Sequence, residues 1–262
     1  MVDPRLTTHG PFLASQIREG DRYELSSGHA IYCVPAGRDH AASNLQGGNI
    51  LGTDPAVEWA GVDAGFSPRP GDLRAPDVAV GAPATEESGW IRGVPQLAVE
   101  YAGVGQDEQD LARKIDDLLS AGTRLVWVIR LVGPQRVEVY EAGKTPRTLG
   151  LGDQLEAPGI LQNRVPVRAL FDRGAGFEVM LRNLLQREGY ADLEAVLNEG
   201  REEGREEGRD GLRQGILAVL RVRGLALDPA ERERIEACRD LALLKAWLVK
   251  AEQAARVAEI FS

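Results

Sequence analysis

A buried strand, an amphipathic helix and a second buried strand follow one another in this sequence, and this succession constrains the fold most. Residues 96–101 and 124–131 are apolar at most consecutive positions, as strands covered on both faces are. Between them, residues 107–121 place four apolar side chains on one helical face: Leu111, Ile115, Leu118 and Leu119. Two strands joined through a helix run parallel. The sequence therefore predicts an α/β domain.

Further patterns predict antiparallel pairs beside this unit. Residues 136–140 alternate polar and apolar side chains directly after a Gly-Pro turn. Near the N-terminus, residues 23–25 and 30–34 flank the polar turn Ser-Ser-Gly-His, and residues 77–80 form a short apolar run. We therefore expect a central mixed β-sheet flanked by helices.

The composition of the chain changes near residue 174. Before this point the sequence is rich in proline, glycine and β-branched runs, whereas after it the pattern is helical and Pro229 is the sole proline. We expect an α/β domain of residues 1–174 and an all-helical tail of residues 175–262.

Within the tail, residues 200–215 repeat a Gly-Arg-Glu-Glu motif. If helical, this segment aligns its five glycines on one face, where a second helix can approach closely; a flexible charged linker is the alternative interpretation. Asp228, Pro229 and Glu231 then predict a helix start. A last helix at residues 240–251 carries a stripe that must be buried: Leu241, Leu244, Trp247, Leu248 and Ala251.

Charge and composition exclude several classes of protein. With 31 Lys and Arg against 40 Asp and Glu, the net charge is −9, so binding to nucleic acid through the overall field is excluded. No uncharged apolar run approaches the roughly 20 residues that span a bilayer. The first residues lack an export signal, which predicts a cytoplasmic protein. Cys33 and Cys238 are too far apart in the sequence to suggest a disulfide framework or a metal-ligand pair.

Two acids stand at the ends of predicted core strands. Asp77 opens one strand and Glu100 closes another. Carboxylates that converge at a sheet edge repel each other unless a divalent cation lies between them, and oxygen ligands suit Mg²⁺ or Mn²⁺. Lys114 lies on the following helix, four residues after Asp110, with which it can pair. Two metal-binding carboxylates and a lysine can hydrolyse phosphodiesters, so we expect Lys114 to matter for chemistry more than for folding.

The spacing alone does not decide between this chemistry and simpler explanations. Single acids at strand ends are common, and an Asp-Lys pair four residues apart is most often a solvated pair on a helix. His40, at the start of a predicted helix over residues 39–51, is by the same argument more often a surface or capping residue than a ligand.

A series of short landmarks between Arg22 and Tyr140 carries a resemblance to a known family. They are Tyr23-Glu24-Leu25, Pro76-Asp77-Val78-Ala79-Val80, Pro95-Gln96-Leu97-Ala98-Val99-Glu100, Asp110 with Lys114, Gly122, and Trp127-Val128-Ile129. In this order they resemble the Uma-two family of putative endonucleases, which belongs to the PD-(D/E)XK restriction-endonuclease-like superfamily.

The resemblance implies a restriction-endonuclease-like core with the acids, the lysine and a divalent metal at one sheet edge. Carried over by position, Asp77 and Glu100 are catalytic acids and metal ligands, Lys114 is the catalytic lysine, and Glu24 is a candidate for a further acid. The acid-x-lysine signature of the superfamily would put a lysine at position 102, where this chain has Ala102. The lysine function therefore moves to Lys114.

Two hypotheses of function follow. The first is a Mg²⁺-dependent (or Mn²⁺-dependent) endonuclease that hydrolyses DNA. The alternative is a catalytically inactive nuclease-fold protein that binds nucleic acid or serves in assembly. The apolar stripe and the glycine face of the tail further predict a homodimer through the C-terminal helices, unless the tail folds back on its own nuclease domain.

Overall fold

The computed structural model of the chain describes residues 10–82 and 89–262. It divides into two compact units, Met1–Ala191 and Asp192–Ser262. Each unit has a hydrophobic core of its own.

A six-stranded sheet forms the centre of the first unit. Its spatial order is β10-β9-β8-β7-β5-β3. The strands are β3 (Ala60–Val62), β5 (Val78–Val80), β7 (Leu97–Ala102), β8 (Leu125–Arg130), β9 (Arg136–Tyr140) and β10 (Arg147–Gly150). β7 and β8 are parallel, while every other neighbouring pair is antiparallel. The predicted mixed sheet is thereby confirmed.

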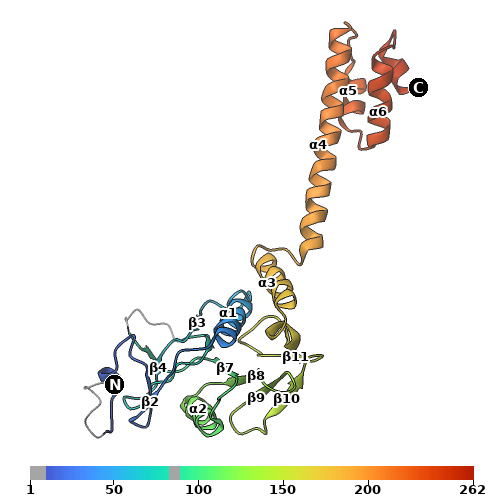
Figure 1. Ribbon diagram of the computed structural model, residues 1–262. Helices are drawn as coiled ribbons and strands as arrows, with labels where there is room; N and C mark the ends of the chain where they lie inside the picture. The colour runs from blue at the N-terminus through green and yellow to red at the C-terminus, as the bar shows by residue number, and fades with distance from the viewer. Residues whose placement is uncertain (1–9, 83–88) are drawn as a thin grey trace. The chain divides into compact units, whose positions relative to one another are not determined.

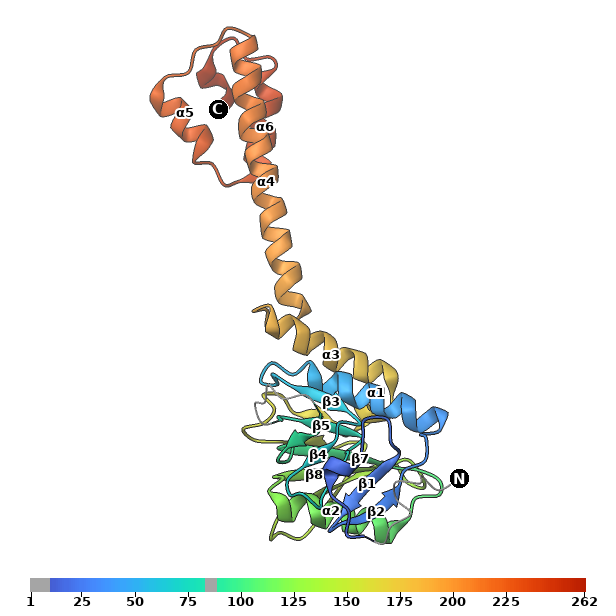
Figure 2. The ribbon, with the colours of Figure 1, turned by 90° about the vertical axis from the view of Figure 1, so that its left-hand side faces the viewer.

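Helices cover both faces of this sheet. Figures 1 and 2 show α1 (Arg38–Gly52) and α3 (Arg173–Arg187) on one side and α2 (Glu108–Ala121) on the other. Along β7, Leu97, Val99 and Tyr101 pack into the core beneath α1 and α3, whereas Ala98 and Ala102 pack against α2. Since side chains alternate along a strand, Glu100 points to the α2 side.

Helix α2 begins and ends where the sequence predicts. Asp107 caps its N-terminus by accepting hydrogen bonds from the backbone N–H groups of Gln109 and Asp110. Gly122 ends it with a φ of 116°, a left-handed conformation that glycine adopts without strain. The helix connects β7 to the parallel strand β8. This connection places Lys114 beside the part of β7 that contains Glu100.

The predicted N-terminal hairpin consists of β1 (Tyr23–Ser26) and β2 (His29–Tyr32). Its two turn residues, Ser27 and Gly28, have positive φ angles, as tight hairpin turns require. The backbone of Leu25 exchanges hydrogen bonds with that of Leu73. This tie places β1 beside the segment that leads into β5.

Shorter elements complete the first unit. They are η2 (Ala14–Gln16), β4 (Phe66–Ser67), β6 (Ile91–Arg92), β11 (Gln154–Leu155), β12 (Val165–Pro166) and η3 (Val167–Leu170).

The predicted boundary at residue 174 falls too early, because α3 belongs to the first unit. A methyl group on Gly176 would lie 3.1 Å from the side chain of Gln46 and 3.3 Å from that of Ile50, both on α1. The Asn183 side chain donates a hydrogen bond to the carbonyl of Ile50. The change in composition marks the start of continuous helix, not the end of the first core.

The second unit is helical, as predicted. It contains α4 (Leu193–Val222), α5 (Pro229–Glu236), α6 (Leu241–Ala251) and η4 (Val257–Phe261). The glycine repeat lies within α4, so the structure has a helix here and not a flexible linker. Gly208 and Gly215 face Leu241 and Leu248 of α6. In the part of the chain that the structure describes, every helix is too short or too polar to cross a membrane.

The apolar stripe of α6 is buried inside this unit. Leu244, Trp247 and Ala251 form one core with residues of α4, α5 and η4. The stripe therefore needs neither a second chain nor the first unit to cover it, and it no longer argues for a dimer.

Candidate functional site

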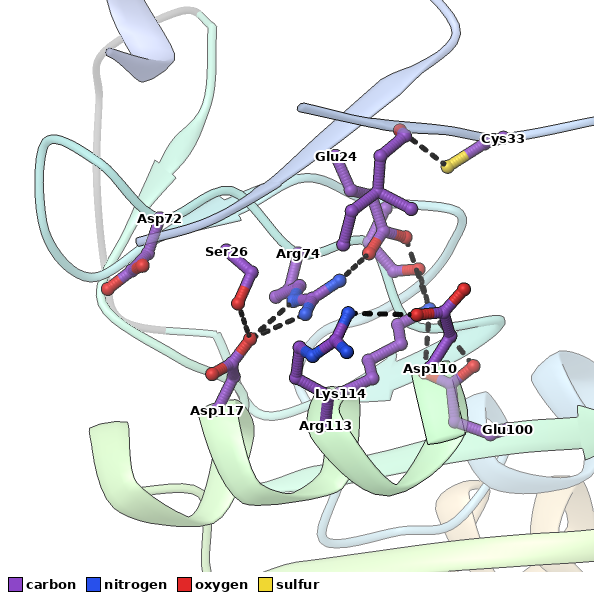
Figure 3. A network of polar contacts seen from close by, with 12 residues as sticks. Glu24, Ser26, Cys33, Asp72, Arg74, Glu100, Asp110, Arg113, Lys114 and Asp117 are labelled. Carbon is purple, nitrogen blue, oxygen red and sulfur yellow. Dashed lines mark hydrogen bonds and ion pairs between the residues drawn. The ribbon is translucent and has the colours of Figure 1, made fainter. Parts of the chain in front are cut away.

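Lys114 lies at the centre of a cluster of acids at the end of β7. Its Nζ is 2.9 Å from Oε1 of Glu100 and 3.2 Å from Oε1 of Glu24, and it donates a hydrogen bond of 2.8 Å to the carbonyl of Ala75. Three segments far apart in the sequence, β1, β7 and α2, meet in this way around one ammonium group (Figure 3).

A buried arginine holds the other oxygen of Glu24. Arg74 is only 3% exposed, and its guanidinium donates to Oε2 of Glu24 at 3.0 Å and also to Asp117 on α2. Asp117 accepts a further hydrogen bond from the hydroxyl of Ser26. Figure 3 shows Asp117 and Lys114 on the same side of α2, both directed toward Arg74 and Glu24. Glu24 is therefore fixed between two cations, and its side chain has little freedom to move.

Asp77 makes a separate set of polar contacts beside this cluster. Its Oδ2 accepts a hydrogen bond of 2.6 Å from the backbone N–H of Tyr101 and lies 3.0 Å from Nε2 of His40. Asn44, one turn after His40 on α1, donates to Oδ1 at 3.3 Å. Helix α1 thus supplies two polar side chains to the carboxylate at the start of β5.

The pairing of β5 with β7 brings the two predicted metal ligands together. Val78 is opposite Val99 in the antiparallel ladder, and one further step along this register sets Asp77 opposite Glu100. The charge of Asp77 acts on Glu100, but Asp77 binds His40 and Asn44 of α1, whereas Glu100 binds Lys114 of α2.

Burial and charge give these groups different acidities. Burial raises the pKa of Glu100 to about 8; Asp77 and Glu24 add to this rise, while Lys114 opposes it. For Asp77, burial raises the pKa, but the hydrogen bond from His40 and the charge of Lys114 outweigh burial, so the pKa is lowered. Asp77 is therefore ionised at neutral pH, whereas Glu100 keeps a proton more readily.

Lys114 and His40 are both stabilised as cations. Burial lowers the pKa of Lys114, but attraction to Glu100, Glu24 and Asp77 more than compensates, and the net pKa lies above its ordinary value. The hydrogen bond to Asp77 raises the pKa of His40. Lys114 consequently acts as a fixed positive charge and not as a base.

The donor set fits a divalent cation. Four carboxylates, those of Glu24, Asp77, Glu100 and Asp117, lie near three cations, Lys114, Arg74 and His40. Burial is the main cause of the raised pKa of Glu100, and the charges of Asp77 and Glu24 add to it. Mg²⁺ binds through one or two carboxylates and keeps several waters, which suits a pair such as Asp77 and Glu100. Within residues 10–82 and 89–262, no three His, Cys, Asp or Glu side chains are already arranged as a metal cage.

Of the four residues that the sequence singled out, Lys114 contacts Glu24 and Glu100 directly, while Asp77 lies beside them with His40 and Asn44 as its side-chain partners. The expected pairing of Lys114 with Asp110 is wrong, because Asp110 pairs with Arg113 at 2.9 Å. The ammonium group of Lys114 binds Glu24 and Glu100 instead, while Asp110 and Arg113 stay at the surface, each about half exposed.

Four residues of the site were missed or underrated. His40 was interpreted as a surface or capping residue, and Arg74, Asp117 and Asn44 were not considered. Spacing gives a signal for two of them: Asp117 lies three residues after Lys114, and Asn44 lies four residues after His40, so each shares a helical face with a site residue. Arg74 gives no such signal, because only the tie between Leu25 and Leu73 brings it to Glu24.

Comparisons with known proteins agree with the fold. The family model Uma2, described as "Putative restriction endonuclease", matches residues 11–168, which is more than half of the chain. A solved structure described as a "putative nuclease belonging to DUF820" from Anabaena variabilis ATCC 29413 is similar in fold, with a TM-score of 0.52 and 17% identity. The similarity covers 62% of this chain and 98% of that one. No curated protein matches significantly.

Proposed function

Because the chain belongs to the Uma2 family of putative restriction endonucleases, we propose that its first unit hydrolyses phosphodiester bonds of DNA with the help of Mg²⁺ or Mn²⁺. The observation that carries this proposal is the surplus of carboxylates around Lys114. Asp77 directly precedes β5, Glu100 lies within the neighbouring strand β7, and a divalent cation would be held between their two carboxylates.

Each side chain has a role that follows from its surroundings. A bound divalent cation lowers the pKa of a water molecule and polarises a phosphate oxygen. Asp77 and Glu100 would hold it, with Asp77 oriented by the N–H of Tyr101. Lys114, held as a cation, offsets the charge that develops on the scissile phosphate. The side chain of His40, 29% exposed, would keep Asp77 ionised and oriented.

The test is metal binding and DNA cleavage on the same preparations. Titration calorimetry with Mn²⁺ should show a site that is lost in the double variant Asp77→Asn with Glu100→Gln. Cleavage of supercoiled plasmid in Mg²⁺ should fall at least a hundredfold in either single variant, since each removes a ligand charge, and should stop in excess chelator.

Asp110→Asn is the matched control. It removes a carboxylate from the same helix as Lys114, but one that is exposed and paired with Arg113. Cleavage and Mn²⁺ binding should be unchanged in this variant. Cleavage that persists in chelator, or in both Asp77→Asn and Glu100→Gln, would contradict the proposal.

The alternative is an inactive nuclease fold that binds nucleic acid or serves in assembly. One observation favours it: position 102, where the superfamily signature has a lysine, is Ala102, and Lys114 is engaged by two acids at once. DNA binding without cleavage in Mg²⁺ or Mn²⁺, across linear, supercoiled and single-stranded substrates, would support this alternative.

Self-association remains part of the proposal. Two copies would present two single-cut sites to one duplex, an arrangement suited to cleaving both strands. The stripe of α6 does not supply the contact, because it is buried within the second unit.

A further inference from the structure

Helix α3 has two faces of different character. One face packs on α1 and the sheet through Gly176, Val179 and Asn183. The other face presents three large apolar side chains: Phe177, Leu181 and Leu184, which are 50%, 47% and 49% exposed. Spacings of four and three residues align them in one stripe. A stripe of this kind on an otherwise packed helix marks a contact surface.

The charged residues at the ends of this stripe are placed against the dipole of the helix. Arg173 is the first residue of α3, and Glu188 is its C-terminal cap. A helix favours negative charge at its N-terminus and positive charge at its C-terminus, so Arg173 and Glu188 sit at the unfavourable ends, next to the favourably placed Asp172 and Arg187. The guanidinium of Arg173 lies over the ring of Phe177, and no ion pair of Arg173 or Glu188 is seen among the described residues.

We propose that this face of α3 binds the same face of a second copy of the chain, with the two helices antiparallel. A twofold axis between Met180 and Leu181 would place Phe177 over the partner's Leu184, since the two positions lie equally far from that axis. The same axis places Arg173 beside the partner's Glu188. Each misplaced charge then lies next to an opposite charge and next to the favourable end of the partner's helix dipole.

The size of the surface sets the strength of the contact. A helix of 15 residues is about 22 Å long, so the α3 pair buries less than the roughly 800 Å² per partner of a standard interface. We expect a dissociation constant on the order of micromolar, which is typical of small interfaces. The inference does not depend on the nuclease proposal, because α3 lies outside the acid cluster.

Sedimentation equilibrium of the full chain between about 1 and 200 µM tests the contribution of the apolar stripe to the proposed dimer. Leu181→Glu would bury a charge beside its own copy on the axis and should raise the dissociation constant at least tenfold. Leu151→Glu is the control, since Leu151 is similarly exposed at 45% but lies in the turn after β10. This variant should dimerise like the natural chain.

A charge exchange tests the antiparallel arrangement. Arg173→Glu and Glu188→Arg should each raise the dissociation constant about fivefold, because each creates a like-charge pair across the axis. The double variant restores both opposite-charge pairs and should dimerise like the natural chain. A parallel pair would not predict this rescue, because it sets Arg173 beside the partner's Arg173.

A monomer at every concentration would overturn the inference, as would a dimer that Leu181→Glu leaves intact. Failure of the double variant to recover would overturn the antiparallel arrangement. Titration with Mn²⁺ on the same proteins keeps the two proposals distinguishable: a natural chain that stays monomeric but binds Mn²⁺ counts against the α3 contact alone.

Discussion

Lys114 shows how burial changes the role expected of a residue. From the sequence it appears as a catalytic group whose loss would not affect folding. In the structure its ammonium neutralises Glu24 and Glu100 in a site where its side chain is 15% exposed. A buried charge whose partner is removed is strongly destabilising. Lys114 therefore serves stability in addition to the chemistry that we propose for it.

The corresponding prediction is that Lys114→Met lowers the free energy of unfolding by about 3 to 5 kcal/mol, because Glu24 and Glu100 are left without their shared cation. Urea denaturation at pH 7.5 measures this. Lys144→Met is the control: Lys144 pairs with Glu141 at the surface, 68% exposed, and its loss should cost less than about 1 kcal/mol. Equal effects in the two variants would show that Lys114 is solvated.

The contact between His40 and Asp77 predicts a pH dependence. The hydrogen bond raises the pKa of His40 above 6.5, so the stabilisation is complete below pH 6.5 and is lost as the pH rises through the raised value. Glu100, whose pKa is raised from 4.5 to about 8, changes stability in the same direction over that wider interval. The free energy of unfolding should therefore fall from about pH 4.5 to about pH 8, and the fall above pH 6.5 should be less steep in His40→Gln.

Proton NMR isolates the histidine in this prediction. The ring signals of His40 should titrate above 6.5 in the natural chain and shift back toward 6.5 in Asp77→Asn, which lacks the charged acceptor. A titration of His40 that is the same in both proteins would exclude the pair.

The candidate site was predictable from sequence only in part, for a physical reason. Asp77 and Glu100 stand out because they adjoin apolar strand runs, and Lys114 stands out through its place on the helix after Glu100 and through the family resemblance. The sequence gives no comparable signal for Arg74 and Asp117, since an Arg in a loop and an Asp on a helix are ordinary surface residues. Their burial arises from the tertiary contact between the N-terminal hairpin and α2.

At the scale of elements, the long periodic segments were predictable and the short ones were not. Helix α2 and strands β7 and β8 follow their patterns closely. Strand β3 pairs through only three residues and β11 through two, so the partner strand and not the local sequence determines them. The place of α3 in the first core was missed because its sequence is as helical as the tail that follows.

The packing of α1 on β7 gives a prediction at this scale. A methyl group on Gly47 would lie 2.1 Å from Oη of Tyr101, which is buried without a hydrogen-bond partner among the described residues. Gly47→Ala should therefore lower the free energy of unfolding by about 2 kcal/mol, although alanine is the better helix former. Tyr101→Phe removes the clashing oxygen, and the double variant should recover most of the loss in urea denaturation.

Gly52→Ala provides the comparison on the same helix. A methyl group there would lie 3.5 Å from Cβ of Ala60, an ordinary contact. Its effect should stay within about 1 kcal/mol. A Gly47→Ala protein as stable as Gly52→Ala would show that α1 does not pack closely on Tyr101.

For the whole molecule, the two separate cores predict two unfolding transitions. Leu244 is fully buried in the core of the second unit, and Leu244→Ala should destabilise that unit by about 3 kcal/mol. Scanning calorimetry should show one transition shifted down and the other unmoved, with the Mn²⁺ site intact. A single transition that shifts as a whole would mean that the units unfold cooperatively.

Strand β7 contributes side chains to both the core and the site. Because its side chains alternate between the two faces of the sheet, the position of a residue along β7 determines which of the two it joins. Glu100 faces Lys114 because it is two positions from Ala98 and from Ala102, which seat α2. A single residue inserted between Val99 and Glu100 would turn the carboxylate to the opposite face, toward α1, and leave Lys114 without its acid. Two inserted residues would keep the face and extend the strand by about 7 Å. In this fold, the alternation of side chains along β7 determines whether Glu100 lies on the same face of the sheet as Lys114.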